Sequence, residues 1–465
     1  MTEKLWTRSA RELAGLIASR EVTATEVLEA HLDRVAEVNG ALNAVVRILE
    51  AEARTGAAEA DRAIAAGEPL GPLHGVPISV KDNIDVVGDV STQGIPLLAE
   101  IPATADAPAV ARMRAAGAIP FVRTNMPELG LRVHTHSATY GLTLNPWDSE
   151  VTVAGSSGGE ASAIAAGMSP LGLGNDIGGS LRNPAYACGI ASIKASTQRV
   201  PYATTTMPGT SLMAEQLMLA QGVLARRVAD VRQGFEVLAG TDPRDPYCIA
   251  APFDGPTTPR RAALVPDPDG GSTDPRISAA VRAAGSILEA AGWQVDEIQP
   301  PRLEEAYLAW TMLMTGDLAH MRPALELALT PESLSFLDAG GELIPAPTPE
   351  SIHATHQLRL EIAVAWATFM EQYPVIIGPT WTQQPFTHGF DITSPETSME
   401  VLEMMRFVLP QNLLGIPAVC VPSGIADGLP TGVQITGRRF REDDCLAVGA
   451  LLEDAFGILT PIDPR

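Results

Sequence analysis

Residues 153–200 read VAGSSGGEASAIAAGMSPLGLGNDIGGSLRNPAYACGIASIKASTQRV, and this stretch decides how the chain folds. It holds two glycine-rich serine turns, at residues 155–159 and 178–180. Between them, residues 160–166 are Ala-rich and predict a short helix that Gly167 ends, and residues 170–173 predict a short buried strand. Glycine permits backbone conformations that other residues avoid. We therefore expect a turn, a helix, a strand and a second turn that fold Ser156 and Ser180 back onto one site.

The same stretch resembles the signature of the amidase signature family. The matching residues are Gly155-Ser156-Ser157-Gly158-Gly159, Asp176-Ile177-Gly178-Gly179-Ser180, Arg182, Pro184-Ala185, Gly189 and Lys194. Ser156 lies 24 residues before Ser180, as in that family. The resemblance implies a Ser–cis-Ser–Lys triad, with Ser180 as the nucleophile and Ser156, in a cis peptide, as the bridging serine. Three positions depart from the family: Ala154 replaces a usual Gly, Asn175 replaces a usual Thr, and Lys194-Ala195-Ser196 stands where Lys-Pro-Thr is common.

A lysine follows the apolar segment at residues 76–80. Strand interiors disfavour lysine, so Lys81 at the end of such a segment is unusual. The pattern alone favours a strand-end lysine that reaches solvent. The resemblance favours a different interpretation, because Gly-Val-Pro-x-x-x-Lys-Asp, here residues 75–82, is where the family carries its catalytic lysine. Carried over to this chain, that residue is Lys81.

Amide hydrolysis by a serine requires a base for the hydroxyl, donors for the oxyanion and an acid for the leaving amine. No histidine has a sequence context that places it beside either serine turn. Lys81 can act as the base only when it is neutral, and neutralising an ordinary lysine at pH 7 costs roughly 4.6 kcal/mol. Burial lowers a lysine pKa by up to ~3–5 units, which removes most of that cost. Ser156 would then relay the proton between Lys81 and Ser180.

Backbone N–H groups of the second turn are the expected oxyanion donors, because a Gly-rich turn can direct successive N–H groups at one point. These are the N–H groups of Ile177, Gly178, Gly179 and Ser180. The resemblance also implies substrate-binding positions at Met126, in a Thr-Asn-Met-x-Glu loop, and at Gly155 and Ser157. This chemistry needs no metal and no organic cofactor.

Two other interpretations of the motifs remain open. Residues 155–159 also fit Gly-x-Ser-x-Gly, the nucleophile elbow of α/β-hydrolases, with Ser157 as the nucleophile. That interpretation requires an acid and a histidine later in the chain, and it leaves Lys81 and Ser180 without a role. The second is an amidotransferase A-type subunit, which works in a complex on charged tRNA. The acidic composition and the departures at Asn175 and Ala195 argue against it.

Helical and strand patterns alternate with short joints along the chain, which predicts an α/β sheet covered on both faces by helices. The resemblance implies the large mixed β-sheet of the amidase signature fold. We expect residues 1–465 to form a single amidase domain. Within it, residues 304–372 are mostly helical, rich in methionine and least similar to the family, as a substrate-specific insertion would be.

The net charge of −23 disfavours nucleic acid or an anionic membrane surface as a partner. Four scattered cysteines without metal-type spacing indicate free thiols in a reducing compartment. Residues 1–20 lack the apolar core of a signal peptide, so we expect a cytoplasmic protein, as a monomer or homodimer. The expected partners are water and a small amide, with aryl or alkyl amides as the first choice. Carbamates (urethanes) and esters share the tetrahedral chemistry and are the alternatives.

Overall fold

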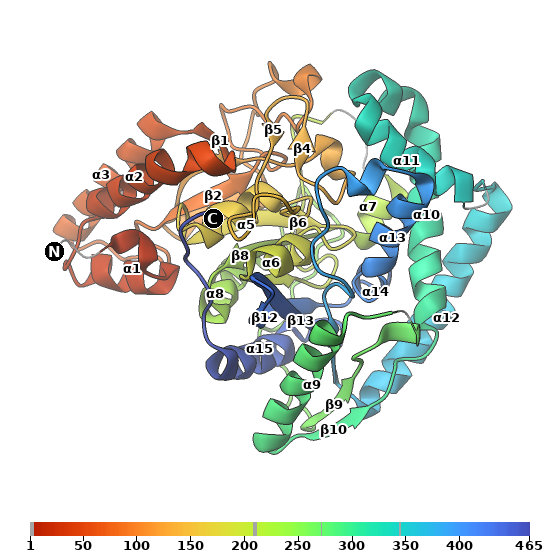
Figure 1. Cartoon of the computed structure of the whole chain (residues 1–465). Coiled ribbons are helices and arrows are strands. Elements are labelled where there is room, and N and C mark those ends of the chain that lie inside the picture. The colour runs from red at the N-terminus through yellow and green to blue at the C-terminus, as the bar shows by residue number, and fades with distance from the viewer. Residues whose placement is uncertain (1–3, 208–211, 271, 344–345) are drawn as a thin grey trace.

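The computed structural model describes residues 4–207, 212–270, 272–343 and 346–465. Within these residues, an 11-stranded mixed sheet crosses the molecule in the order β1-β3-β2-β6-β8-β7-β12-β13-β11-β9-β10 (Figure 1). Its strands are β1 (Val45–Ile48), β2 (Pro77–Lys81), β3 (Ile119–Thr124), β6 (Leu171–Asp176), β7 (Ala191–Lys194), β8 (Ala220–Ala225), β9 (Arg261–Leu264), β10 (Gln294–Glu297), β11 (Val375–Pro379), β12 (Ala418–Ala426) and β13 (Leu429–Gly437). A separate two-stranded sheet pairs β4 (His136–Ser137) with β5 (Gly141–Leu142). The predicted fold class, a large mixed sheet in an α/β protein, is confirmed.

Side chains of the central strands alternate between two apolar cores, because successive residues of a strand point to opposite faces of the sheet. On β11, Val375 and Ile377 join one core, whereas Ile376 between them joins the other. On β12, Val419 and Cys420 divide in the same way. Both faces are therefore apolar, and each requires a layer of helices to exclude water.

Helices on the first face include the N-terminal group, which lies to the left in Figure 1. Their apolar sides form one core with the sheet, and they are α1 (Ala10–Ala18), α2 (Ala24–Leu42), α3 (Glu50–Ala66), α4 (Pro108–Ala115), α8 (Val228–Leu238), α9 (Pro275–Ala290) and α15 (Glu442–Phe456). The predicted capping box at the start of α2 is present, with Thr23 and Glu26 each bonding the other's backbone N–H. Such a box satisfies backbone donors that a helix start otherwise leaves unpaired.

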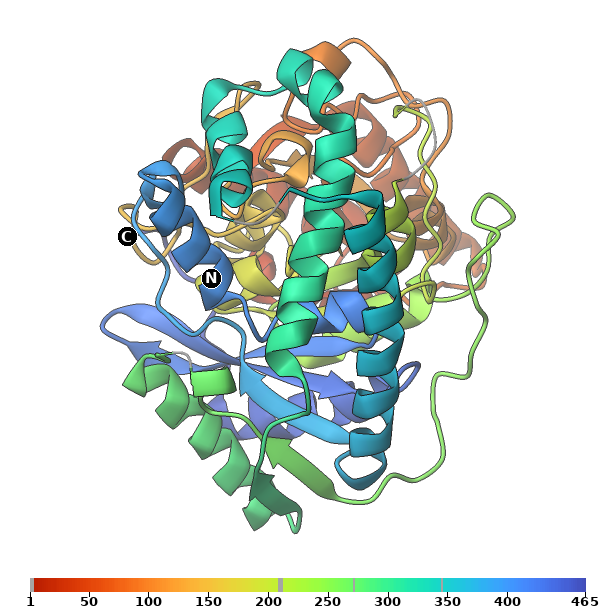
Figure 2. The ribbon, with the colours of Figure 1, turned by 90° about the vertical axis from the view of Figure 1, so that its right-hand side faces the viewer.

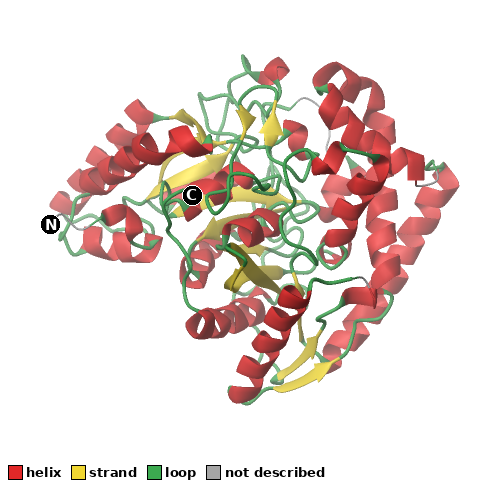
Figure 3. Cartoon of the chain, viewed as in Figure 1, coloured by secondary structure: helices red, strands yellow, loops and turns green. Residues whose placement is uncertain are grey.

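The second face carries shorter helices near the signature and long ones farther away. They are α5 (Gly158–Ala165), α6 (Arg182–Cys188), α7 (Met213–Met218), α10 (Leu303–Ala328), α11 (Pro331–Leu343), α12 (Pro349–Gln372), α13 (Pro395–Met404) and α14 (Leu409–Leu414). Figure 2 shows α10 and α12 running side by side along this face, and Figure 3 shows how little strand structure this part of the chain contains. Most of the described residues between 304 and 372 thus belong to α10, α11 and α12.

Short 3₁₀ turns lie at Leu5–Thr7, Pro96–Leu98, Glu128–Gly130, Pro268–Gly270 and Phe390–Ile392. None of the helices formed by the described residues is both long and apolar enough to cross a membrane.

Strand pairing places the signature beside the predicted lysine. β2 and β6 are parallel neighbours, with Ser79 opposite Gly172 and Val80 opposite Leu173. The carboxyl ends of parallel strands meet at the same edge of a sheet, which is where open α/β sheets bind ligands. Lys81 ends β2 and Asp176 ends β6, so the two stretches that carry the motifs converge there.

Candidate active site

Lys81 is completely buried at the carboxyl end of β2, and its ammonium nitrogen has two partners. Its Nζ lies 2.7 Å from Ser156 Oγ and 2.9 Å from Asn175 Oδ1. Asn83 Nδ2 donates to the same Asn175 oxygen at 3.2 Å, which fixes the orientation of that amide. The strand-end lysine therefore points into the protein, toward the first serine turn, and does not reach solvent.

Burial lowers the pKa of Lys81 to about 7, because the surrounding protein solvates the ammonium poorly. The negative charges of Asp176 and Glu160 act in the opposite direction and raise it. Glu160 is itself completely buried, and burial raises the pKa of its carboxyl to about 7. Hydroxyl groups of Ser79 and Thr124 donate to Glu160 and lower its pKa. A neutral lysine is thus accessible near pH 7 without a histidine.

The first serine turn packs tightly against neighbouring backbone. The peptide bond between Gly155 and Ser156 is cis, as the resemblance implied. Ala154 just before it has φ +62°, in the left-handed region that favours glycine, which agrees with the Gly that the family usually has there. A Cβ atom on Gly159 would lie 2.4 Å from the backbone nitrogen of Asn125, so only glycine fits. This packing fixes the position of the first residues of α5, which follow Ser156 in the chain.

An ion pair beneath the second turn fixes its shape. Asp176 accepts two hydrogen bonds from the Arg182 guanidinium, at 2.9 and 3.0 Å, and both side chains are completely buried. Burial by itself raises the pKa of Asp176, but the Arg182 charge holds that pKa well below its usual range. The same carboxylate also accepts the backbone N–H groups of Gly179 at 2.7 Å and Leu181 at 3.1 Å. Asp176 is therefore an anchor for the turn.

Asp176 occupies one of the four N–H groups that the sequence predicts as oxyanion donors. The N–H group of Gly179 is already paired with Asp176, so it points toward the carboxylate. Among the described residues, no acceptor pairs with the N–H groups of Ile177, Gly178 or Ser180. In the part of the chain that the structure describes, three of the four predicted donors are therefore unpaired.

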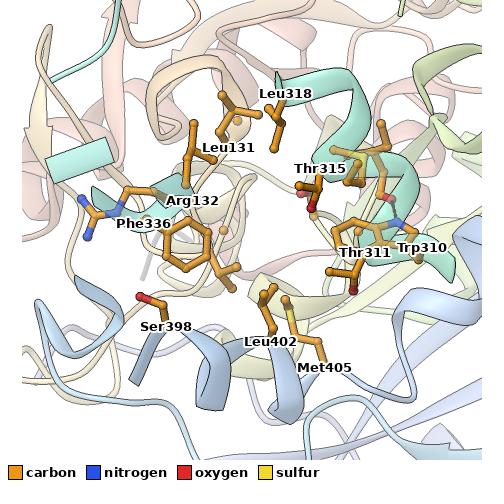
Figure 4. A pocket seen from close by; sticks show the side chains of 18 residues that line it. Leu131, Arg132, Trp310, Thr311, Thr315, Leu318, Phe336, Ser398, Leu402 and Met405 are labelled. Atoms are coloured by element: carbon orange, nitrogen blue, oxygen red, sulfur yellow. Dashed lines mark hydrogen bonds between the residues drawn. The ribbon is translucent and has the colours of Figure 1, made fainter. Parts of the chain in front are cut away.

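A cavity beside Ser180 consists of two adjoining compartments. The first compartment, of about 110 Å³, is lined by Gly155, Gly178 and Ser180 from the two turns and by largely apolar side chains that include Leu131, Trp310, Met314, Leu318, Phe336, Leu402 and Met405. Figure 4 shows Trp310, Thr311 and Thr315 approaching it from α10, opposite Phe336, while the guanidinium of Arg132 points away from it. Arg132 instead forms a buried ion pair with Asp391 at 2.8 Å.

The second compartment, of about 210 Å³, has a more polar wall and also reaches Ser180. Ser156 and Asn175 line it, together with Asn83 and Tyr202. Ser180 and Ile177 belong to the walls of both compartments. Ser180 therefore lies where the two compartments meet. Ser156 and Asn175 line the second compartment, and Gly178 lines the first.

The sequence is similar to known proteins over nearly its whole length. The model of the amidase family matches residues 26–446. The chain belongs to the amidase family. An indoleacetamide hydrolase of Bradyrhizobium diazoefficiens is 40% identical over 461 residues, which cover 98% of this chain and 88% of that protein.

Solved structures of other proteins have the same fold as this amidase. 6-Aminohexanoate cyclic dimer hydrolase, complexed with substrate, matches with a TM-score of 0.84 and 30% identity over 99% of both chains. A bacterial aryl acylamidase matches with a TM-score of 0.83 and 25% identity, over 98% of this chain and 96% of that one. The protein is thus a hydrolase of amide C–N bonds, as the sequence predicted.

The remaining site residues predicted for the amidase lie close to the cavity but outside its walls. Ser157 is completely buried, and its hydroxyl has no hydrogen-bond partner among the described residues. Its N–H group donates to the carbonyl of Ser180 at 3.1 Å, so it ties the two turns together. Met126 is also buried, and its methyl group lies behind Gly130, which lines both compartments. These positions support the walls and turns around Ser180.

Sequence reasoning missed two features of the site. Glu160 follows the first serine turn directly, where the Ala-rich pattern predicts only a helix, although a carboxylate inside such a segment is a visible signal. Trp310 lies in the segment least similar to the family, and no local pattern distinguished it from the other apolar residues of α10. In the structure the charge of Glu160 acts on Lys81, and Trp310 packs against Gly178 of the second turn.

Proposed function

We propose that the protein is a serine amidase in which Ser180 attacks the carbonyl carbon of a small aryl or alkyl amide. The observation that carries the proposal is the 2.7 Å contact between Lys81 Nζ and Ser156 Oγ, on the wall of a compartment that also contains Ser180. Lys81 is buried, with a pKa lowered to about 7, so the neutral amine needed for a base is well populated at neutral pH.

Acylation proceeds through two linked proton transfers. Ser156 accepts the Ser180 proton as it gives its own to the neutral Lys81, and Ser180 Oγ bonds to the substrate carbon. Negative charge develops on the carbonyl oxygen, where the free N–H groups of Ile177, Gly178 and Ser180 stabilise it. The leaving nitrogen then takes a proton from Ser156, which Lys81 replaces, and the C–N bond breaks. Water repeats the sequence on the acyl-enzyme to release the acid.

The two compartments suggest how the substrate lies. An acid must reach the leaving nitrogen, so the leaving amine belongs in the second compartment, where Ser156 and Asn175 form part of the wall. The carbonyl oxygen and the acyl group belong in the first compartment, which contains Gly178 of the oxyanion turn. Its largely apolar wall favours an aryl or alkyl acyl group.

Indoleacetamide hydrolase and aryl acylamidase, among the similar proteins, are named for aryl-containing amides, and this supports an aryl substrate. Carbamates and esters pass through the same tetrahedral intermediate and remain the second candidates. The apolar first compartment does not separate them from amides, so an activity screen across anilides, primary arylacetamides, carbamates and p-nitrophenyl esters decides the preference.

Covalent labelling tests the nucleophile directly. We expect a fluorophosphonate probe to label Ser180 in the parent protein, and Ser180→Ala to fold normally while losing both labelling and amide hydrolysis. Peptide mapping that finds the label on Ser157 would instead support the nucleophile-elbow interpretation and refute the assignment of Ser180.

A further inference from the structure

The carbonyl groups of the oxyanion turn show what orients its three free N–H groups. In a trans peptide, the C=O and N–H bonds point in opposite directions across one plane. Three carbonyls of the turn accept a hydrogen bond from outside it: Asp176 from Asn412 Nδ2 at 3.0 Å, Ile177 from Trp310 Nε1 at 2.8 Å, and Gly179 from the Asn183 N–H at 2.7 Å. The N–H groups on the opposite edges of these planes are the three free donors, those of Ile177, Gly178 and Ser180.

The remaining plane of the turn, between Gly178 and Gly179, is held on both edges. Its N–H group pairs with Asp176, and its carbonyl accepts from Asn183 Nδ2 at 3.3 Å. Each peptide plane of the turn therefore has a fixed orientation. For a free donor, that orientation is set by the group that binds the carbonyl on the far side.

Trp310 differs from the other two carbonyl anchors because it also forms part of the substrate cavity. Its indole ring lines the first compartment, while its N–H group binds the Ile177 carbonyl. The ring covers Gly178 so closely that a Cβ atom there would lie 2.5 Å from Trp310 Cζ2. Asn412 and Asn183 belong to the wall of neither compartment. One side chain thus contacts both the space for the acyl group and the peptide plane that carries the Gly178 donor.

We propose that Trp310 is a positioning residue that aims the Gly178 N–H at the oxyanion and links the fit of the acyl group to transition-state stabilisation. The inference rests on the proposed function, because it assigns the oxyanion to this turn. An acyl group that packs against the indole holds the ring in place, and the ring holds the Ile177–Gly178 plane. Poorly fitting acyl groups should therefore lower kcat and not only raise KM.

Exchange of the Trp310 indole for its benzothiophene isostere tests this role, because sulfur replaces the N–H group and the shape of the ring is kept. We expect kcat for an anilide to fall roughly 10-fold to 100-fold, less than the loss of a whole oxyanion donor, while KM changes little. Affinity for an aryl boronic acid, whose tetrahedral adduct uses the same donors, should fall by a similar factor. Trp310→Phe, made by ordinary mutagenesis, should give the same direction of change in kcat.

Trp381→Phe is the matched control. Trp381 is a buried indole on the same face, stacked on Phe386, and its Nε1 has no acceptor among the described residues. We expect this variant to keep the kcat of the parent, even where its melting temperature falls.

The outcomes separate the inference from the proposed function. An unchanged kcat in the benzothiophene variant, or a rise in KM alone, would show that Trp310 is only a wall of the cavity. Absence of fluorophosphonate labelling at Ser180 in the parent protein would overturn the proposed function itself, whatever the Trp310 variants show.

Discussion

Replacement of Lys81 by methionine should damage amide cleavage more than ester cleavage. The side chain is completely buried, so methionine fills nearly the same space without a charge, and Asn175 keeps Asn83 as a partner. The pKa falls from 10.5 to about 7 in the folded protein. At about 1.4 kcal/mol for each pKa unit, the folded protein favours the neutral lysine over the protonated one by about 5 kcal/mol more than water does. At pH 7 it raises the neutral fraction from roughly one molecule in 3,000 to about one half.

The expected losses follow from the number of proton transfers that need the lysine. General acid–base assistance is typically worth ~10²–10⁴-fold for each transfer. An activated ester needs Lys81 only to deprotonate the serines, because p-nitrophenolate leaves without a proton. An anilide needs it a second time, because the amine must be protonated as the C–N bond breaks. Lys81→Met should therefore lose one such factor on the ester and about two on the anilide.

The assay compares kcat/KM for an anilide and a p-nitrophenyl ester with the same acyl group, in the parent and in Lys81→Met. Parent activity should also rise with pH and level off above about pH 7, since the lowered pKa makes the neutral, active form dominant above that value. Equal losses on both substrates would refute the role of Lys81 as the source of the leaving-group proton. Negligible losses would remove it from the mechanism.

Three further predictions concern the groups around the lysine. Glu160→Gln removes a negative charge that raises the pKa of Lys81, so the acid limb of the pH–rate profile should move to lower pH. An acid limb that stays in place would show that the charges of the two side chains are not coupled. Ser156→Ala should retain the melting temperature of the parent but lose roughly 10²-fold or more in amide kcat, and full activity would exclude a proton relay. Asp176→Asn removes the negative charge that pairs with the buried Arg182 and should lower the free energy of unfolding in urea by about 3–5 kcal/mol, whereas a change below about 1 kcal/mol would contradict its role as the anchor of the turn.

Local patterns in the sequence predicted the elements of the signature well. The expected turn, helix, strand and turn occur as α5 and β6 between the two serine turns. The strand is longer than predicted, because it continues through Asn175 and Asp176, two residues that strands disfavour. They pair with Gln221 and Ala220 of β8, so tertiary pairing overrides local preference.

The fine geometry of the site depends on contacts that no local pattern contains. The motif predicted four oxyanion donors, but the sequence alone could not show that the N–H group of Gly179 donates a hydrogen bond to Asp176. The carbonyl anchors come from far along the chain: Trp310 lies 133 residues beyond Ile177, and Asn412 lies 236 residues beyond Asp176. A single sequence carries no signal for pairs at such separations, because each depends on how whole helices pack.

The position of the β12–β13 hairpin has a consequence for biosynthesis. β12 pairs with β7 and β13 pairs with β11, so this hairpin joins the part of the sheet that carries Lys81 and Asp176 to the part formed by β9, β10 and β11. A ribosome releases the chain from its N-terminus, so every other strand of the sheet emerges first. Until the hairpin arrives, β7 and β11 each present an open edge, the kind of surface on which unfinished chains associate. Both serine turns are therefore synthesised early, but the nascent amidase needs protection from aggregation until its last two strands close the sheet.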